Sequence, residues 1–196
     1  MGRHREFDTE KALDAALAVF WAKGFEGASY GDLTAATGVA RPGLYAAFGN
    51  KEEMFFKALA RYDETFMAFF PVALEEARAI DVARKCLRGA AEVQAGAGTP
   101  AGCFGINGAL ACSDEGESVR SALAHRRLRA EGVLAERFMR AKAEGDLRAD
   151  ADPAALARFV MTVSQGMSVQ AKAGATREEL VEVAELALAG WPSEAR

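Results

Sequence analysis

The 196-residue chain is poor in cysteine and histidine. Its three cysteines, Cys86, Cys103 and Cys112, show no CxxC spacing, and its two histidines, His4 and His125, lie far apart in the sequence. Disulfide frameworks and zinc sites use paired or closely spaced ligands. The pattern therefore predicts neither, favours a reducing, cytoplasmic location, and gives no reason to expect a metal or another cofactor.

Long hydrophobic runs are also missing. The longest apolar stretch, AALAVFWA at residues 15–22, is far shorter than the ~20 residues that span a bilayer. The first ten residues, MGRHREFDTE, contain no apolar core of the kind found in secretory signals. These absences predict a protein without a membrane partner.

The sequence has no excess of positive charge. Its net charge is −4, and residues 1–60 contain seven Lys or Arg against eight Asp or Glu. Proteins that coat nucleic acid without sequence preference are usually basic. If this chain binds DNA, it must use a few local positive groups.

What the sequence does contain is helical periodicity. Apolar residues make up 51% of the chain, and Leu13, Leu17 and Phe20 illustrate their spacing at i, i+4 and i+7. No segment shows sustained strand alternation. We expect an all-α fold of about nine helices, with domains at 1–50 and 51–196 that are joined by a long helix. The later helices are expected at 51–70, 74–95, 101–112, 116–144, 152–173 and 176–190.

A helix-turn-helix is indicated at residues 30–47. A helix of about eight residues is followed by a turn at Gly38 and by the helix RPGLYAAF, which begins at Arg41. Pro42 falls in the first helical turn, where its missing N–H is tolerated, and Gly43 leaves room for a DNA backbone. By spacing alone, a plain helical hairpin with solvated Arg and Lys is the alternative.

Several side chains near this motif suit DNA. Arg41 can reach base edges or phosphates, and the Tyr45 hydroxyl and Lys51 can hold phosphates on either side. The N-terminal arm GRHR can enter a minor groove through Arg3 and Arg5, as homeodomain arms do. A disordered tail is the alternative for this arm.

Residues 9–55 resemble the DNA-binding region of the TetR family of bacterial repressors. The similarity runs through an amphipathic first helix, the KGF triplet, a serine at the start of the second helix, the GV turn and an LY..F..K pattern. The resemblance implies a homodimer whose recognition helices, residues 41–47, enter successive major grooves of a double-stranded operator. The sequence departs from the family at Ala40, where Ser or Thr is frequent, and at Ala47, where His is frequent.

The resemblance also assigns roles to individual residues. Ser29 matches the phosphate-contacting start of the second helix, Tyr30 an exposed neighbour, and Tyr45 and Lys51 the backbone clamps. The expected DNA-binding residues are Ser29, Tyr30, Arg41, Pro42, Gly43, Tyr45 and Lys51.

In this family the C-terminal helices form a dimer interface and a cavity for a small-molecule inducer. Helices 116–144 and 152–173 resemble the pair that builds the interface. The apolar positions that suit either this interface or the protomer's own core are Leu156, Phe159, Val160, Val163 and Met167. The residues expected to line the inducer site are Phe66, Cys103, Phe104 and Asn107.

The glycine–cysteine pair that opens segment 101–112 resembles a TetR subgroup, some members of which sense electrophiles or oxidants. Cys103 would lie in the first helical turn, where the helix dipole favours a thiolate. An inert buried thiol is the alternative. If 101–112 is one helix, Cys103 and Cys112 are ~13.5 Å apart along its axis, too far for a disulfide.

The expected function is therefore transcriptional regulation, most simply repression that an inducer relieves, with a cysteine-based redox or electrophile sensor as the alternative version. An enzyme using Cys103 and His125 would lack a third group to orient its base. An architectural DNA-binding protein without an inducer would not need so large a C-terminal region and would usually be basic.

Overall fold

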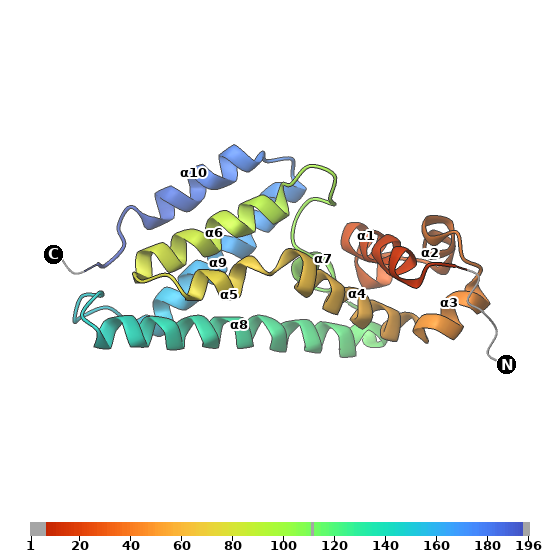
Figure 1. The fold of residues 1–196 in the computed structure, drawn as a ribbon, viewed down its shortest axis with the longest axis horizontal. Helices are drawn as coiled ribbons and strands as arrows, with labels where there is room; N and C mark the ends of the chain where they lie inside the picture. Colours follow the sequence, from red (N-terminus) through yellow and green to blue (C-terminus); the bar gives the residue numbers. More distant parts are fainter. Residues whose placement is uncertain (1–6, 111, 194–196) are drawn as a thin grey trace. The chain divides into compact units, whose positions relative to one another are not determined.

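A computed structural model describes residues 7–110 and 112–193. Within these ranges every regular element is a helix, and the prediction of an all-α fold is confirmed, with ten α-helices instead of nine. The helices are α1 (Thr9–Gly27), α2 (Tyr30–Thr37), α3 (Arg41–Phe48), α4 (Lys51–Phe66), α5 (Phe69–Leu74), α6 (Ala79–Gln94), α7 (Phe104–Asn107), the 3-10 helix η1 (Asp114–Gly116), α8 (Glu117–Ala143), α9 (Pro153–Lys172) and α10 (Arg177–Leu188) (Figure 1). None of the helices described is long and apolar enough to cross a membrane.

The chain forms two compact units. Unit 1 contains the described residues up to Phe66 together with Phe104–Leu123, and unit 2 contains Met67–Cys103 and the described residues from Ala124 onward. The boundary predicted at residue 50 does not coincide with this division. Helix α4 and the segment from α7 to the start of α8 pack with the N-terminal helices.

Unit 1 is built around aromatic side chains from α1, α4 and α7. Helix α4 contributes Phe55 and Tyr62, and both side chains are fully buried. The Phe55 ring lies 5.3 Å from that of Phe20 and 5.0 Å from that of Phe104, while Tyr62 lies 4.9 Å from Trp21. These contacts hold α7 against α1 and α4.

Side-chain caps fix the starts of several helices. Asp8 accepts hydrogen bonds from the N–H groups of the first turn of α1. Asn50 accepts from the Glu53 N–H at 2.9 Å before α4, and Asp152 accepts at the start of α9. Each of these caps satisfies backbone donors that have no partner within the helix.

Helix α3 starts without such a cap. Ala40 occupies the N-cap position in an extended conformation and makes no side-chain hydrogen bond. We expect Ala40→Ser to raise the free energy of unfolding by ~0.5–1 kcal/mol, because its hydroxyl can accept from the Gly43 N–H, which now donates to the Ala40 carbonyl at 2.8 Å. Urea denaturation measures this gain. Ala46→Ser, within the same helix, is the control and should lower stability by up to ~0.5 kcal/mol. No gain at residue 40 would contradict the capping argument.

The helix predicted at 101–112 is much shorter than expected. Helix α7 covers only Phe104–Asn107, because Gly102 has a left-handed φ of 84° and the backbone there is not helical. Cys103 therefore precedes a single helical turn instead of opening a long helix. The premise used to exclude a bond between Cys103 and Cys112 is wrong, although all three cysteines are free thiols in the structure.

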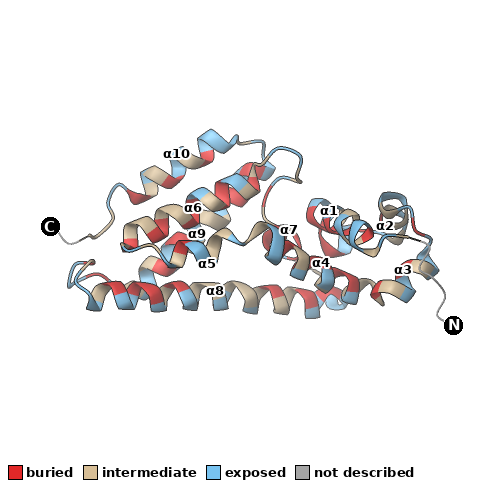
Figure 2. Cartoon of the chain, viewed as in Figure 1, coloured by how far each residue is buried: buried red, intermediate tan, exposed pale blue. Residues whose placement is uncertain are grey.

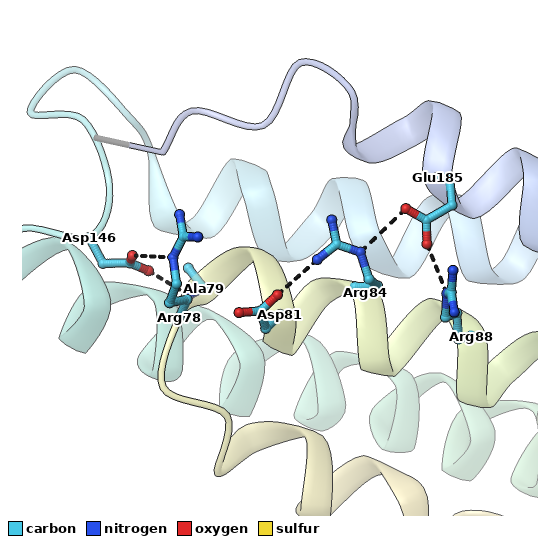
Figure 3. Close-up of polar contacts among 7 residues, drawn as sticks. All are labelled: Arg78, Ala79, Asp81, Arg84, Arg88, Asp146 and Glu185. Carbon is cyan, nitrogen blue, oxygen red and sulfur yellow. Dashed lines mark hydrogen bonds and ion pairs between the residues drawn. The ribbon is translucent and has the colours of Figure 1, made fainter. Parts of the chain in front are cut away.

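The helix predicted at 74–95 is interrupted, and α6 begins only at Ala79. The reason lies far away in the sequence: the Asp146 carboxylate accepts from the Ala79 N–H at 2.6 Å and from Arg78 Nε at 3.4 Å (Figure 3). The buried Arg137 guanidinium donates to the carbonyl of Leu74 at 3.0 Å, where α5 ends. Tertiary contacts thus satisfy both helix ends at this break.

Unit 2 has α6 packed against α5, α9 and α10. Its core contains Leu87, Phe138 and Leu180, from α6, α8 and α10. On the polar side, Glu185 of α10 accepts from Arg84 at 3.3 Å and from Arg88 at 2.8 Å (Figure 3). Figure 2 shows buried and exposed residues on different sides of α10, as expected for a helix that covers a core with one face.

Candidate nucleic-acid interface

The turn between α2 and α3 has the geometry that the sequence predicted. Gly38 adopts a left-handed conformation with φ 68°, and its N–H donates to the Thr34 carbonyl at 3.0 Å. Val39 is buried beside the turn, and Leu33 and Leu44 are fully buried in the two helices. These contacts lock α2 and α3 into a helix-turn-helix.

One face of α3 is free for an external partner. Arg41, Pro42 and Tyr45 are exposed, and Tyr45 retains 60% of its accessible surface. Leu44 and Phe48 point inward, so the exposed and buried sets lie on different sides of the helix. The structure thus brings three of the predicted DNA-binding residues together on one surface.

Gly43 has an internal role as well. A Cβ atom at this position would lie 2.9 Å from Cγ1 of Val39 and 3.7 Å from Cε1 of Phe7. Its place in the sequence predicts only that this glycine leaves space for a DNA backbone. Close packing against the turn already requires a small residue here.

Ser29 is engaged in capping α2. Its hydroxyl accepts from the Asp32 N–H at 3.0 Å and donates to the Asp32 carboxylate at 2.7 Å. The ammonium of Lys23, 2.5 Å away, together with Ser29 holds the pKa of Asp32 well below its usual range. The phosphate contact expected of Ser29 stays a prediction.

Tyr30, half-buried at the start of α2, lies beneath a cation. The Arg41 guanidinium carbon is 4.0 Å from the centroid of the Tyr30 ring. The spacing of two separate helices does not show that their side chains meet, so this contact could not be predicted. The sequence signal is limited to an aromatic residue that opens one helix of the motif and an arginine that opens the next.

Lys51 begins α4 and is half-buried. Its ammonium lies 4.8 Å from the centroid of the Phe25 ring. Partial burial lowers the pKa of Lys51, while the carboxylates of Glu26 and Glu115 act in the opposite direction. The predicted phosphate clamp stays a prediction. Arg3 and Arg5 of the N-terminal arm lie outside the described residues.

The four residues predicted for the inducer site fall in both units. Phe66 stacks on Tyr62, with ring centroids 5.6 Å apart, and Phe104 is fully buried in the aromatic cluster of unit 1. Cys103 belongs to unit 2, where its N–H donates to the buried Ser168 hydroxyl at 2.7 Å. Their role in binding an inducer stays a prediction.

Asn107, the fourth of these residues, ties the α7 segment to the end of α1. Its side-chain amide donates to the Trp21 carbonyl at 3.1 Å, and the Phe25 N–H donates to the Gly108 carbonyl at 2.9 Å. Gly24 makes this approach possible: its φ is 74°, and a Cβ there would lie 2.7 Å from the Asn107 carbonyl oxygen.

A second connection follows α7. The N–H and hydroxyl of Ser113 both donate to the Glu26 carboxylate, and these hydrogen bonds lower the pKa of Glu26. The segment from α7 to α8 is therefore hydrogen-bonded to the last turns of α1 at several points.

The residues predicted for the dimer interface differ in how far they are buried. Val160 and Met167 are almost completely buried in the core of unit 2. Leu156 and Val163 are partly buried and pack against that core, whereas Phe159 keeps 42% of its surface exposed. Val160 and Met167 thus serve the protomer's own core.

Beside them, an open groove of about 890 Å³ runs between α9 and α10. Gly166 of α9 and Val183 and Leu186 of α10 are among its lining residues. Val183 and Leu186 are 45% and 77% exposed. This face of unit 2 is therefore both hollowed and apolar.

Comparison with known proteins matches both parts of the chain. Residues 12–58 match the family described as bacterial regulatory proteins, tetR family, and residues 83–186 match a tetracyclin repressor-like C-terminal domain. The chain is 35% identical over 193 residues to the HTH-type transcriptional repressor ComR of Escherichia coli (strain K12), covering 97% of this chain and 92% of that protein. It is 29% identical to the E. coli repressor BdcR over 95% of this chain and 90% of that protein.

A solved structure shows that the similarity includes the fold. A cysteine-substituted form of the TetR family transcriptional regulator CifR, complexed with 26-base-pair operator DNA, is 41% identical to this chain. The TM-score is 0.92, and the match covers 97% of this chain and all of that one. The resemblance seen in the sequence is confirmed, and the chain belongs to the tetR family of bacterial regulatory proteins.

Proposed function

We propose that this chain is a cytoplasmic transcriptional repressor that binds a palindromic operator as a homodimer. The observation that carries the proposal is the exposed face of α3, which presents Arg41 and Tyr45 at the front of a well-formed helix-turn-helix. Support comes from ComR, which is named a repressor, and from CifR, whose structure contains operator DNA.

A dimer is required because the charge around one recognition helix is too small for tight binding. Two linked helices gain affinity because the second binding event is intramolecular. We place the dimer interface on α9 and α10, where the groove and the exposed Val183 and Leu186 lie. This choice keeps helix 152–173 of the pair predicted from the sequence and replaces helix 116–144 by α10. A second copy would cover this apolar face.

The effector response can reach the DNA-binding helices through the α7 segment. This segment is hydrogen-bonded to the end of α1 and is joined by the chain to unit 2 at Cys103 and at Ala124. A small molecule that binds preferentially to a conformation in which this segment has moved would shift the population away from the DNA-binding form.

The direct test is binding to DNA from upstream of the protein's own gene. A gel shift and a footprint should show one discrete, salt-sensitive complex on a pseudo-palindrome whose half-site centres lie one helical turn, or a small multiple of it, apart. Binding without sequence preference would instead support an architectural role and would contradict the proposal.

Two substitutions test the assignment of the interface. Arg41→Ala should weaken operator binding by ~1–3 kcal/mol and change the preferred base at one position of each half-site. Lys51→Ala should weaken binding to all sequences alike and reduce the salt dependence. Titrations at several salt concentrations measure both effects. Unchanged affinity in both variants would show that α3 and the start of α4 do not form the DNA-binding surface.

A further inference from the structure

The guanidinium of Arg41 is held by an aromatic ring and by nothing else that the structure describes. It lies 4.0 Å from the centroid of Tyr30 and forms no ion pair or hydrogen bond with residues 7–110 or 112–193. The other two arginines that the structure describes in unit 1 are paired with carboxylates: Arg61 with Asp14 at 2.8 Å and Arg120 with Glu117 at 2.7 Å. Arg41 thus rests on the ring while its N–H donors remain unused by the residues that the structure describes.

The ring beneath Arg41 is itself well fixed. Tyr30 is the first residue of α2, directly after the capping box of Ser29 and Asp32, and is half-buried. Arg41 is the first residue of α3, and the Gly38 turn sets the distance between the two helices. The contact between Arg41 and Tyr30 therefore connects the starts of both helices of the motif on its exposed side.

Stacking on an aromatic face leaves the donors of an arginine available. The five N–H groups lie in the plane of the guanidinium, so a ring that covers one face does not block them. An arginine whose plane is already fixed loses less conformational freedom on forming two parallel hydrogen bonds. In a major groove, the partner that accepts such a pair is guanine, through O6 and N7.

We propose that Tyr30 is a positioning residue for operator recognition, whose ring holds the Arg41 guanidinium so that it reads a guanine in each half-site. This inference rests on the proposed function. Tyr30 then contributes to DNA recognition by positioning Arg41. The family resemblance predicted only that Tyr30 is an exposed neighbour of Ser29. The face of the ring makes the contact with Arg41, so the Tyr30 hydroxyl is not needed for positioning.

The experiment compares wild type with Tyr30→Phe, Tyr30→Leu, Arg41→Lys, Arg41→Ala and the double variant Tyr30→Leu/Arg41→Ala. Each is titrated against the operator and against a panel in which every base pair of the half-sites is replaced in turn. Thermal denaturation and light scattering confirm that each variant is folded and dimeric.

We expect Tyr30→Phe to bind like wild type, because it keeps the ring. Tyr30→Leu should weaken operator binding about two- to fivefold and relax the preference for guanine at the same base pair as Arg41→Ala. Arg41→Lys should also lose this preference although it keeps the charge, because an ammonium cannot make the paired contact. The double variant should bind no more weakly than Arg41→Ala alone, because the ring acts through the arginine.

Other outcomes overturn the inference. If Tyr30→Phe weakens binding to all sequences, the hydroxyl contacts the DNA backbone directly. If the effects of Tyr30→Leu and Arg41→Ala add, or fall on different base pairs, the two residues act independently. If wild type itself shows no preference for any sequence, the proposed function fails, which is distinct from specific binding that is insensitive to Tyr30.

Discussion

Leu186→Glu is expected to convert the protein into monomers that no longer hold the operator. Leu186 is 77% exposed on α10, beside the groove that α9 and α10 form. A carboxylate there costs little in an isolated protomer but cannot be buried unpaired against a second copy. Loss of the second recognition helix should lower operator affinity by roughly 10²–10⁴-fold. Light scattering and operator titration measure the two effects.

A matched control lies on α8. Leu128 is 63% exposed on a helix that does not line the groove, so Leu128→Glu should leave the dimer and its operator affinity intact. If Leu128→Glu gives monomers and Leu186→Glu does not, the pair 116–144 and 152–173 predicted from the sequence forms the interface. Met167 is unsuitable for this test because it is only 1% exposed, and a charge there would disrupt the protomer's core.

Gly24→Ala is expected to lower the free energy of unfolding by roughly 2–4 kcal/mol and the melting temperature by roughly 5–15 °C. The backbone at Gly24, with φ 74° and ψ 177°, is a conformation that other residues rarely adopt. The new Cβ would also lie 2.7 Å from the backbone carbonyl oxygen of Asn107. The α7 segment would have to move, which weakens the hydrogen bond from the Phe25 N–H to the Gly108 carbonyl.

Gly27→Ala is the control for this substitution. Gly27 lies three residues later in α1, has no left-handed φ, and would place its Cβ 3.6 Å from that of Lys23, an ordinary contact. It should leave stability unchanged or raise it by up to ~1 kcal/mol. Chemical denaturation of the two variants checks the difference. Equal stabilities would show that the approach of α7 to α1 contributes little.

Local chemistry was sufficient to predict much of the fold. Helical periodicity predicts α8 and α9 to within one residue of their observed ends. Asn50 and Asp152 cap the helices that follow them, and such caps act on backbone donors only two or three residues away. The helix-turn-helix was readable for the same reason. Gly38 and Val39 set the turn through backbone conformation and a nearby apolar contact.

Long-range contacts decided what the sequence could not show. The break before α6 depends on Asp146, which lies 67 residues from the N–H of Ala79 that it caps. The helix predicted over 101–112 is cut short, because the backbone there follows the hydrogen bonds that it makes to α1 around Gly24.

The candidate DNA-binding site likewise has features that local sequence predicts and features that depend on long-range contacts. A helix-turn-helix with Arg41 at the start of its second helix could be predicted from local residue patterns alone. The contact of Arg41 with Tyr30, the burial of Val160 beside an exposed Phe159, and the packing of α7 against α1 depend on the three-dimensional fold. Periodicity fixes which residues share a helix face, but the neighbour that covers this face is chosen by packing between elements distant in the chain.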